Sequence, residues 1–268
     1  MQDINVFEEQ DVAWTPTPDV IERSRLTEFM RQVGVHGWDD LYRYSIDDVA
    51  RFTADVLQFL DIKFDPPARE LLDTSGGIEM PLWLAGAGLN ISQTCLDRWQ
   101  TAEMKDRPAL IWEGEESAVT ELTYAELYAE VERCAAGFRS LGFKKGDAVG
   151  IHLPMMPETV VCLLALARIG AIAVPIFSGY GVEAISSRLN AVQAVALITC
   201  DAFPRRGKLY QAHEVAREAQ RQSPSVATVV VVSRSRTSEQ IDAGWINYDE
   251  MLQPTAMVPA NRRRPKIR

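Results

Sequence analysis

Apolar residues follow two different patterns along this chain. In the first hundred residues they recur every three or four positions, in residues 21–34 and again in residues 46–62. This spacing predicts amphipathic helices, each with one face that packs against a core. Residues 65–90 contain Pro-Pro, Ser-Gly-Gly and Gly-Ala-Gly with little periodicity. We therefore expect an irregular segment there.

Local signals mark where these two helices begin. Thr17 and Pro18 offer an N-cap followed by proline at the first helical position. Ser45 with Asp48 resembles a capping box at the start of the second helix.

From residue 108 onward, short apolar runs alternate with helical patterns. The runs are continuous, as in strands that are buried on both faces of a parallel sheet. The expected strands are residues 109–114, 148–153, 171–177, 194–200 and 226–233. The expected helices are residues 123–142, 157–170, 181–192 and 208–223. This order predicts an α/β fold: a mostly parallel sheet with helices on both faces, preceded by a helical and irregular N-terminal extension.

Composition narrows the class of protein. The 268 residues are 47% hydrophobic and 24% charged, as in an ordinary globular protein, and the formal net charge is −9. This negative charge disfavours a nucleic-acid partner, which would need a basic face. The N-terminus is acidic, and no apolar run approaches the roughly 18 residues that span a bilayer. We expect a cytoplasmic protein with no membrane partner.

The four cysteines are far apart in the sequence and do not form a CxxC pair, so we expect no metal site. Cys162 and Cys200 lie within apolar runs, which favours buried, reduced thiols.

Two glycine-containing turns are candidate binding sites. Residues 179–184 fit the pattern GxGxxA between a strand and a helix, and Asp201 follows about 20 residues later, as in a dinucleotide-binding fingerprint. That fingerprint belongs to the first strand of its fold, whereas at least two expected strands come before this one. A plain strand-to-helix turn is the alternative interpretation.

The second candidate consists of Arg205, Arg206, Gly207 and Lys208, directly after an expected strand. Three cations around a glycine at the carboxyl end of a parallel strand favour a phosphate-binding site, because ligands of open α/β sheets collect at that edge. A solvated run of charges is the alternative. His152 lies within an expected strand and is interpreted as a packed histidine rather than a catalytic one.

Several stretches of the chain, in their order, resemble acetyl-CoA synthetase-like members of the AMP-forming acyl-CoA synthetases, in the adenylate-forming superfamily. The resemblance runs from about Ala13 to about Leu252. The stretches that carry it are residues 38–48, 56–65, 80–99, 106–115, 122–180 and 183–208.

The resemblance implies a ligase that uses ATP, Mg²⁺ and coenzyme A (CoA). A carboxylic acid would attack ATP to give an acyl-adenylate and diphosphate, and the CoA thiol would then displace AMP. The segment from Arg205 to Lys208 matches one that binds the nucleotide end of CoA in this family. Arg206 departs from the pattern, because the family usually has a small residue at that position.

The resemblance also divides the chain. It implies an N-terminal extension over residues 1–107 and the first α/β subdomain of the large domain over residues 108–252. Residues 253–268 form a basic tail whose last residues fit neither the family nor the preceding composition, and we expect this tail to be disordered. The family's TSGTTGxPKG loop, which should follow residue 254, does not occur in the sequence.

We therefore expect the N-terminal portion of such a ligase, without catalytic residues of its own and inactive alone. A frameshift or premature stop, a short protein completed by a partner chain, and a gene boundary are the three interpretations of the tail. Three alternatives for function or partners also remain open: a non-catalytic CoA- or nucleotide-binding module or subunit of a split synthetase, a dehydrogenase-like dinucleotide domain, and self-association through an exposed sheet edge.

Overall fold

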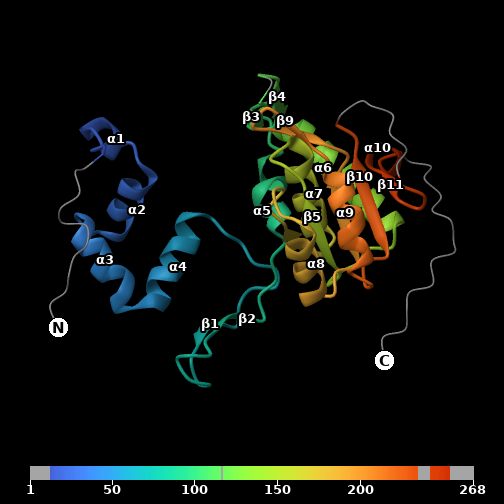
Figure 1. Ribbon diagram of the computed structural model, residues 1–268. Helices are drawn as coiled ribbons and strands as arrows, with labels where there is room; N and C mark the ends of the chain where they lie inside the picture. The colour runs from blue at the N-terminus through green and yellow to red at the C-terminus, as the bar shows by residue number, and fades with distance from the viewer. Residues whose placement is uncertain (1–12, 116, 235–241, 254–268) are drawn as a thin grey trace, which may run out of the picture. The chain divides into compact units, whose positions relative to one another are not determined.

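The computed structural model describes residues 13–115, 117–234 and 242–253. The chain forms two compact units, Met1–Leu89 and Asn90–Arg268 (Figure 1). The expected division at residues 107 and 108 follows the family resemblance rather than compactness, and it stays a prediction. The expected basic tail lies outside the described residues, except for Gln253.

The first unit consists of four helices and a β-hairpin. Its elements are α1 (Pro18–Glu22), α2 (Arg25–Val33), α3 (Trp38–Asp47), α4 (Val49–Phe59), β1 (Glu70–Asp73) and β2 (Leu82–Ala85). Strands β1 and β2 pair antiparallel. The expectation that residues 65–90 would be irregular throughout was therefore wrong, because both strands are only four residues long and too short to show a period.

The helix boundaries in this unit also differ from the expected ones. Residues 21–34 are not one helix: the chain breaks before α2, where the Ser24 side chain accepts a hydrogen bond from the amide of Thr27 and caps a new helix. The cap of α4 is Asp48, which accepts from the amide of Arg51, whereas Ser45 lies inside α3. In each case a side chain with an oxygen acceptor satisfies a free amide of the first turn.

A small aromatic cluster forms the core of this first unit. Phe29 is 5% exposed, and its ring makes edge-on contacts with Phe52 at 6.0 Å and Phe59 at 5.3 Å between ring centroids. These contacts join α2 to α4.

The second unit is built on a five-stranded sheet in the order β11-β10-β7-β5-β6, in which every pair is parallel. Its strands are β5 (Ala148–His152), β6 (Ile172–Pro175), β7 (Ala196–Cys200), β10 (Thr228–Val232) and β11 (Ile246–Asn247). The helices of this unit are α5 (Ile91–Cys95), η1 (Asp97–Trp99), α6 (Tyr124–Ser140), α7 (Pro157–Arg168), α8 (Val182–Ala191), α9 (Ala212–Arg221) and α10 (Tyr248–Met251). Two antiparallel hairpins, β3 (Pro108–Glu113) with β4 (Val119–Thr123) and β8 (Phe203–Arg205) with β9 (Lys208–Tyr210), complete it.

Helices cover both faces of this sheet, which confirms the expected α/β fold (Figure 1). Neighbouring residues of β10 show how the two cores arise: Val230 packs in a core with residues of α6 and α7, whereas Val229 and Val231 pack with residues of α8 and α9. Successive side chains of a strand point to opposite faces, so a strand with a core on each face must be apolar throughout.

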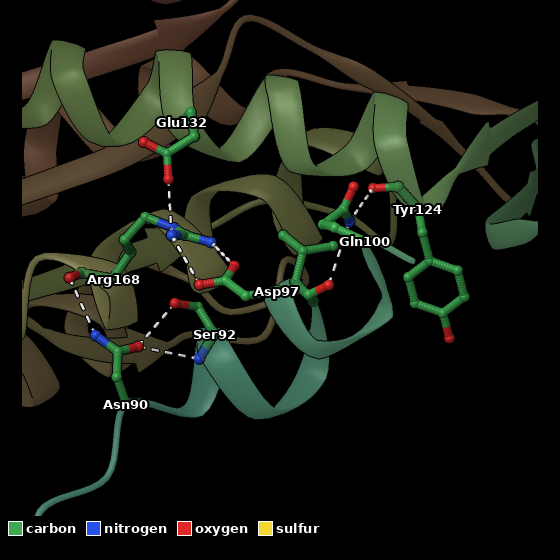
Figure 2. Close-up of polar contacts among 8 residues, drawn as sticks. Asn90, Ser92, Asp97, Gln100, Tyr124, Glu132 and Arg168 are labelled. Atoms are coloured by element: carbon green, nitrogen blue, oxygen red, sulfur yellow. Dashed lines mark hydrogen bonds and ion pairs between the residues drawn. The ribbon is translucent and has the colours of Figure 1, made fainter. Parts of the chain in front are cut away.

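A polar network attaches the start of this unit to α6 and α7 (Figure 2). Arg168, at the end of α7, donates hydrogen bonds to both carboxylate oxygens of Asp97 in η1 and forms an ion pair with Glu132 of α6 at 2.7 Å. The Asn90 side chain donates to the backbone oxygen of Arg168 at 3.1 Å. The side chain of Arg168 is only 12% exposed, so these contacts offset the cost of burying its charge.

Helix α6 starts as the sequence predicts. The Thr123 hydroxyl accepts from the amide of Glu126, and the Glu126 carboxylate accepts from the amide of Thr123, which makes a complete capping box. Cys162 and Cys200 are free and buried, as expected. None of the described helices is both long and apolar enough to cross a membrane.

Candidate functional site

Two loops meet at the carboxyl edge of the parallel sheet. One follows β6 and runs through residues 177–181, and the other follows β7 and leads into the β8–β9 hairpin. The Arg205 guanidinium of the second loop lies over the Phe177 ring of the first, 5.3 Å from its centroid. The structure thus brings the two sequence candidates, the glycine turn and the run of cations, into one place.

The hairpin is closed by a two-residue turn at Arg206 and Gly207, with φ angles of 51° and 73°. Left-handed values at both positions are typical of the type I′ turn, which matches the twist of the two strands. The prediction that a helix starts at residue 208 was wrong. Lys208 pairs with Arg205 in the hairpin, and α9 begins only at Ala212. Directly paired residues of an antiparallel ladder share a face, so Arg205 and Lys208 present their charges together.

Close approach of Arg205 explains the glycine at position 179. A Cβ atom placed on Gly179 would overlap the Arg205 guanidinium. By contrast, a Cβ on Gly181 would meet no atom within 4 Å. The first glycine of the GxGxxA pattern therefore leaves room for the Arg205 guanidinium in its present position.

Asp201 of that pattern is engaged with the backbone. Its Oδ1 atom accepts hydrogen bonds from the amides of Ala202 at 2.7 Å and Arg234 at 2.8 Å. The bond from Arg234 connects the ends of β7 and β10.

A second layer of side chains supports the site. Arg188 of α8 stacks on the Tyr180 ring, with its guanidinium carbon 4.4 Å from the centroid. The Tyr210 hydroxyl of β9 donates to the backbone oxygen of Tyr180 at 3.1 Å. Burial raises the pKa of Tyr210, and the positive charge of Arg205 opposes this rise.

Sequence reasoning did not assign a binding role to Phe177, Tyr180, Arg188 or Tyr210. The sequence does contain a signal for Arg188. This residue lies seven positions, or about two helical turns, after Gly181, so it shares a face of α8 with the glycine turn. The aromatic residues carry no such signal, since an aromatic residue beside a strand is most often part of a core.

Four cations lie on the β8–β9 hairpin and on helix α8, which follows the first loop. We call Arg188, Arg205, Arg206 and Lys208 the cationic cluster. Within the part of the chain that the structure describes, no Asp or Glu forms an ion pair with any of the four. In a chain of net charge −9, these cations, three of them on the β8–β9 hairpin, make a candidate site for a polyanion.

An exposed aromatic face adjoins these charges. Phe177 is 57% exposed although it lies beside Arg205. An apolar side chain next to cations without carboxylate partners among the described residues suits a ligand that has both a flat ring and phosphate groups. The ring of the ligand can stack on Phe177 while its phosphates bind the guanidinium groups.

A hollow of about 630 Å³ lies elsewhere on this unit. It is lined in part by Trp112, Arg133 and Arg234. Arg133 forms an ion pair with Glu130 there, and the lining also includes the carboxylates of Glu158 and Asp249. Because these carboxylates would repel an anion, we place the candidate anion site at the cationic cluster rather than in this hollow.

Fold and site together describe an α/β protein with a candidate anion site at the carboxyl edge of its parallel sheet. Residues 97–263 match the model of the AMP-binding enzyme family, whose description is "AMP-binding enzyme". The match covers more than half of the chain, and the chain belongs to this family.

Individual relatives are CoA synthetases. The chain is 31% identical to acetyl-coenzyme A synthetase of Methanothrix soehngenii over 252 residues, which are 89% of this chain and 36% of the relative. It is 32% identical to 3-hydroxypropionyl-coenzyme A synthetase of Sulfurisphaera tokodaii over 243 residues, which are 85% of this chain and 36% of the relative.

A solved structure shows the same fold. Acetoacetyl-CoA synthetase from Streptomyces lividans superposes with a TM-score of 0.78 and 28% sequence identity, over 89% of this chain and 37% of that structure. The expected resemblance to the acyl-CoA synthetases is thus confirmed. The chain spans slightly more than a third of the length of each of these proteins.

Proposed function

We propose that this chain is a part of an acid–CoA ligase and that the cationic cluster binds the nucleotide end of CoA. The complete reaction would convert a carboxylate, ATP and CoA to acyl-CoA, AMP and diphosphate. The observation that supports this role is the position of Arg205, which lies between the exposed Phe177 ring and Gly179 without a carboxylate partner among the described residues.

CoA has the chemistry that such a site can recognise. Its nucleotide end carries an adenine ring, a diphosphate and a 3′-phosphate. A guanidinium can bind phosphate oxygens with two parallel hydrogen bonds, and Lys208 adds a point charge beside Arg205. The adenine ring would stack on Phe177.

Binding of CoA by the purified 268-residue chain can be measured by titration calorimetry. We expect Arg205→Ala to weaken binding at least tenfold, because a charge-assisted hydrogen bond contributes about 1.5–3 kcal/mol and tenfold corresponds to about 1.4 kcal/mol. Arg221→Ala removes the same charge from an exposed ion pair with Glu218, away from the hairpin, and should leave binding unchanged. Equal losses in both variants, or no heat with the wild type, would contradict the proposal.

We further propose that the chain alone does not form an acyl-adenylate. Stabilising the charge that develops on the phosphates of ATP requires a loop of backbone amides together with cations. The 268 residues contain no Ser/Thr/Gly-rich loop of the TSGTTG kind. We assign the cationic cluster to CoA rather than to ATP. Acid-dependent exchange of labelled diphosphate into ATP by the purified chain would contradict this.

A non-catalytic CoA-binding module is the second candidate function. Such a module would give the same CoA titration as a part of a ligase. The two differ when the remaining two thirds of a related synthetase is added: a ligase part should restore acetate-dependent AMP formation, whereas a module should not. Cytoplasmic location and self-association through the sheet edge stay predictions.

A further inference from the structure

A fully buried histidine lies beneath the candidate site. His152 is the last residue of β5, and its side chain is 0% exposed. Its Nδ1 atom is 3.3 Å from the Thr199 hydroxyl of β7, and its Nε2 atom is 3.2 Å from the backbone oxygen of Ser178. The His152 ring on β5 therefore contacts both the central strand of the sheet, β7, and the loop that follows β6.

The two partners fix the position of the proton on this ring. A carbonyl oxygen only accepts hydrogen bonds, so Nε2 must carry the hydrogen that it donates to Ser178. The lone pair of Nδ1 then accepts from the Thr199 hydroxyl, which is itself fully buried. Burial lowers the pKa of His152 to about 4, so the ring is neutral near pH 7, as this arrangement requires.

Ser178 is the residue between the two that contact Arg205. Phe177 lies under the guanidinium, and the α-carbon of Gly179 packs against it. A shift of the Ser178 carbonyl would move both neighbours. The only other hydrogen bond from a side chain to a backbone oxygen of residues 177–181, among the described residues, comes from Tyr210 and reaches Tyr180.

We propose that His152 is a positioning residue, whose bond from Nε2 to Ser178 holds the loop of residues 177–181 in the conformation that receives Arg205 and the ligand. This inference rests on the proposed function, because the ligand is the nucleotide end of CoA. His152 touches neither the ligand nor a reacting atom. Its effect passes through the backbone of Ser178.

Two amide substitutions separate this role from simple packing. In His152→Gln, the amide nitrogen reaches the position of Nε2 and can still donate to Ser178. In His152→Asn, the shorter amide reaches only the position of Nδ1, so the bond to Ser178 is lost. We expect His152→Asn to weaken CoA binding about tenfold and His152→Gln to stay within about threefold of the wild type.

Amide hydrogen exchange of residues 177–181 gives a readout that needs no ligand. We expect faster exchange of this loop in His152→Asn than in His152→Gln, with no change in α6. If the wild-type chain takes up no CoA, the proposed function fails, and the exchange comparison still decides the role of His152.

A second pair of variants covers the case in which His152→Asn does not fold. Thr199→Val removes the hydroxyl that donates to Nδ1, whereas Thr199→Ser keeps it. Only the valine variant should speed exchange of the loop. The inference is overturned if the loop exchanges at the wild-type rate in a folded His152→Asn variant, or, where that variant does not fold, in Thr199→Val.

Discussion

Arg168 and Asp97 are 71 positions apart in the sequence, yet both terminal nitrogens of the Arg168 guanidinium bind the Asp97 carboxylate. This contact attaches the short helical turn η1 to the end of α7 (Figure 2). The arginine is largely buried and the aspartate is 30% exposed, so solvent screens the pair less than it screens a surface ion pair.

Replacing Asp97 should therefore destabilise the second unit. We expect Asp97→Asn to lower the free energy of unfolding by about 2 kcal/mol, because the charge of Arg168 would be left with Glu132 alone. Urea unfolding followed by circular dichroism measures this change. Glu218→Gln, which breaks the exposed pair with Arg221, is the matched control and should cost less than about 0.5 kcal/mol. Similar losses in the two variants would show that Arg168 and Asp97 are not coupled as described.

Gly179→Ala should weaken ligand binding more than it affects stability. The added methyl group would overlap the end of the Arg205 side chain, which is flexible and can move away. We expect CoA affinity to fall about tenfold, as for loss of one charge-assisted contact, with a change in unfolding free energy of under about 1 kcal/mol. Gly181→Ala is the control, since its methyl group meets no atom within 4 Å and its φ is −82°. A Gly179→Ala chain that binds as tightly as the wild type would argue against this position for Arg205.

Stability should fall in mild acid because of His152. Burial lowers the pKa of this residue from the ordinary 6.5 to about 4 in the folded protein. Between these two values the unfolded chain binds a proton that the folded chain does not, so the free energy of unfolding decreases as the pH falls. From pH 7 to pH 5 the expected loss is about 2 kcal/mol. Above about pH 7.5 this residue makes almost no contribution to the pH dependence of stability.

The variant His152→Gln isolates that contribution, because its carboxylates titrate as in the wild type. Urea unfolding at pH 5 and pH 7 should give a smaller pH dependence for the variant by about 2 kcal/mol. If the free energy of unfolding changes equally with pH in the two proteins, His152 takes up its proton in the folded state as readily as in the unfolded chain.

The capping box of α6 should contribute measurably to stability. Thr123→Ala removes the oxygen that accepts from the amide of Glu126, and we expect a loss of about 1 kcal/mol in thermal or urea unfolding. Thr123→Ser keeps an oxygen acceptor and should retain most of that energy. If alanine and serine behave alike, the hydroxyl does not cap the helix in solution.

Elements with a long, regular pattern could be predicted from the sequence. The capping box at Thr123, the buried helix from Pro157 and the apolar strands β5, β7 and β10 were all expected, because each has its signal within a few neighbouring residues. Short elements were missed. Strands β1, β2 and β9 are three or four residues long, and the break before α2 depends on the single side chain of Ser24.

Only part of the candidate site could be predicted from the sequence. The run from Arg205 to Lys208 and the glycine at position 179 could each be singled out, but as unrelated motifs. Their relation depends on two loops that follow different strands and meet at the sheet edge, so no local pattern encodes it. The position of Arg206 in a tight turn likewise became clear only from its left-handed φ.

The sequence by itself determined the α/β class, the family and the position of the cations, because hydrophobic period and residue order are local or collinear properties. Only the tertiary structure decided which residues meet: Arg168 with Asp97, Arg205 with Gly179, and His152 with Ser178. Each of these contacts joins different elements of the second unit. Their existence depends on the order of strands in the sheet and on the direction of each side chain, which the packing of the whole core fixes.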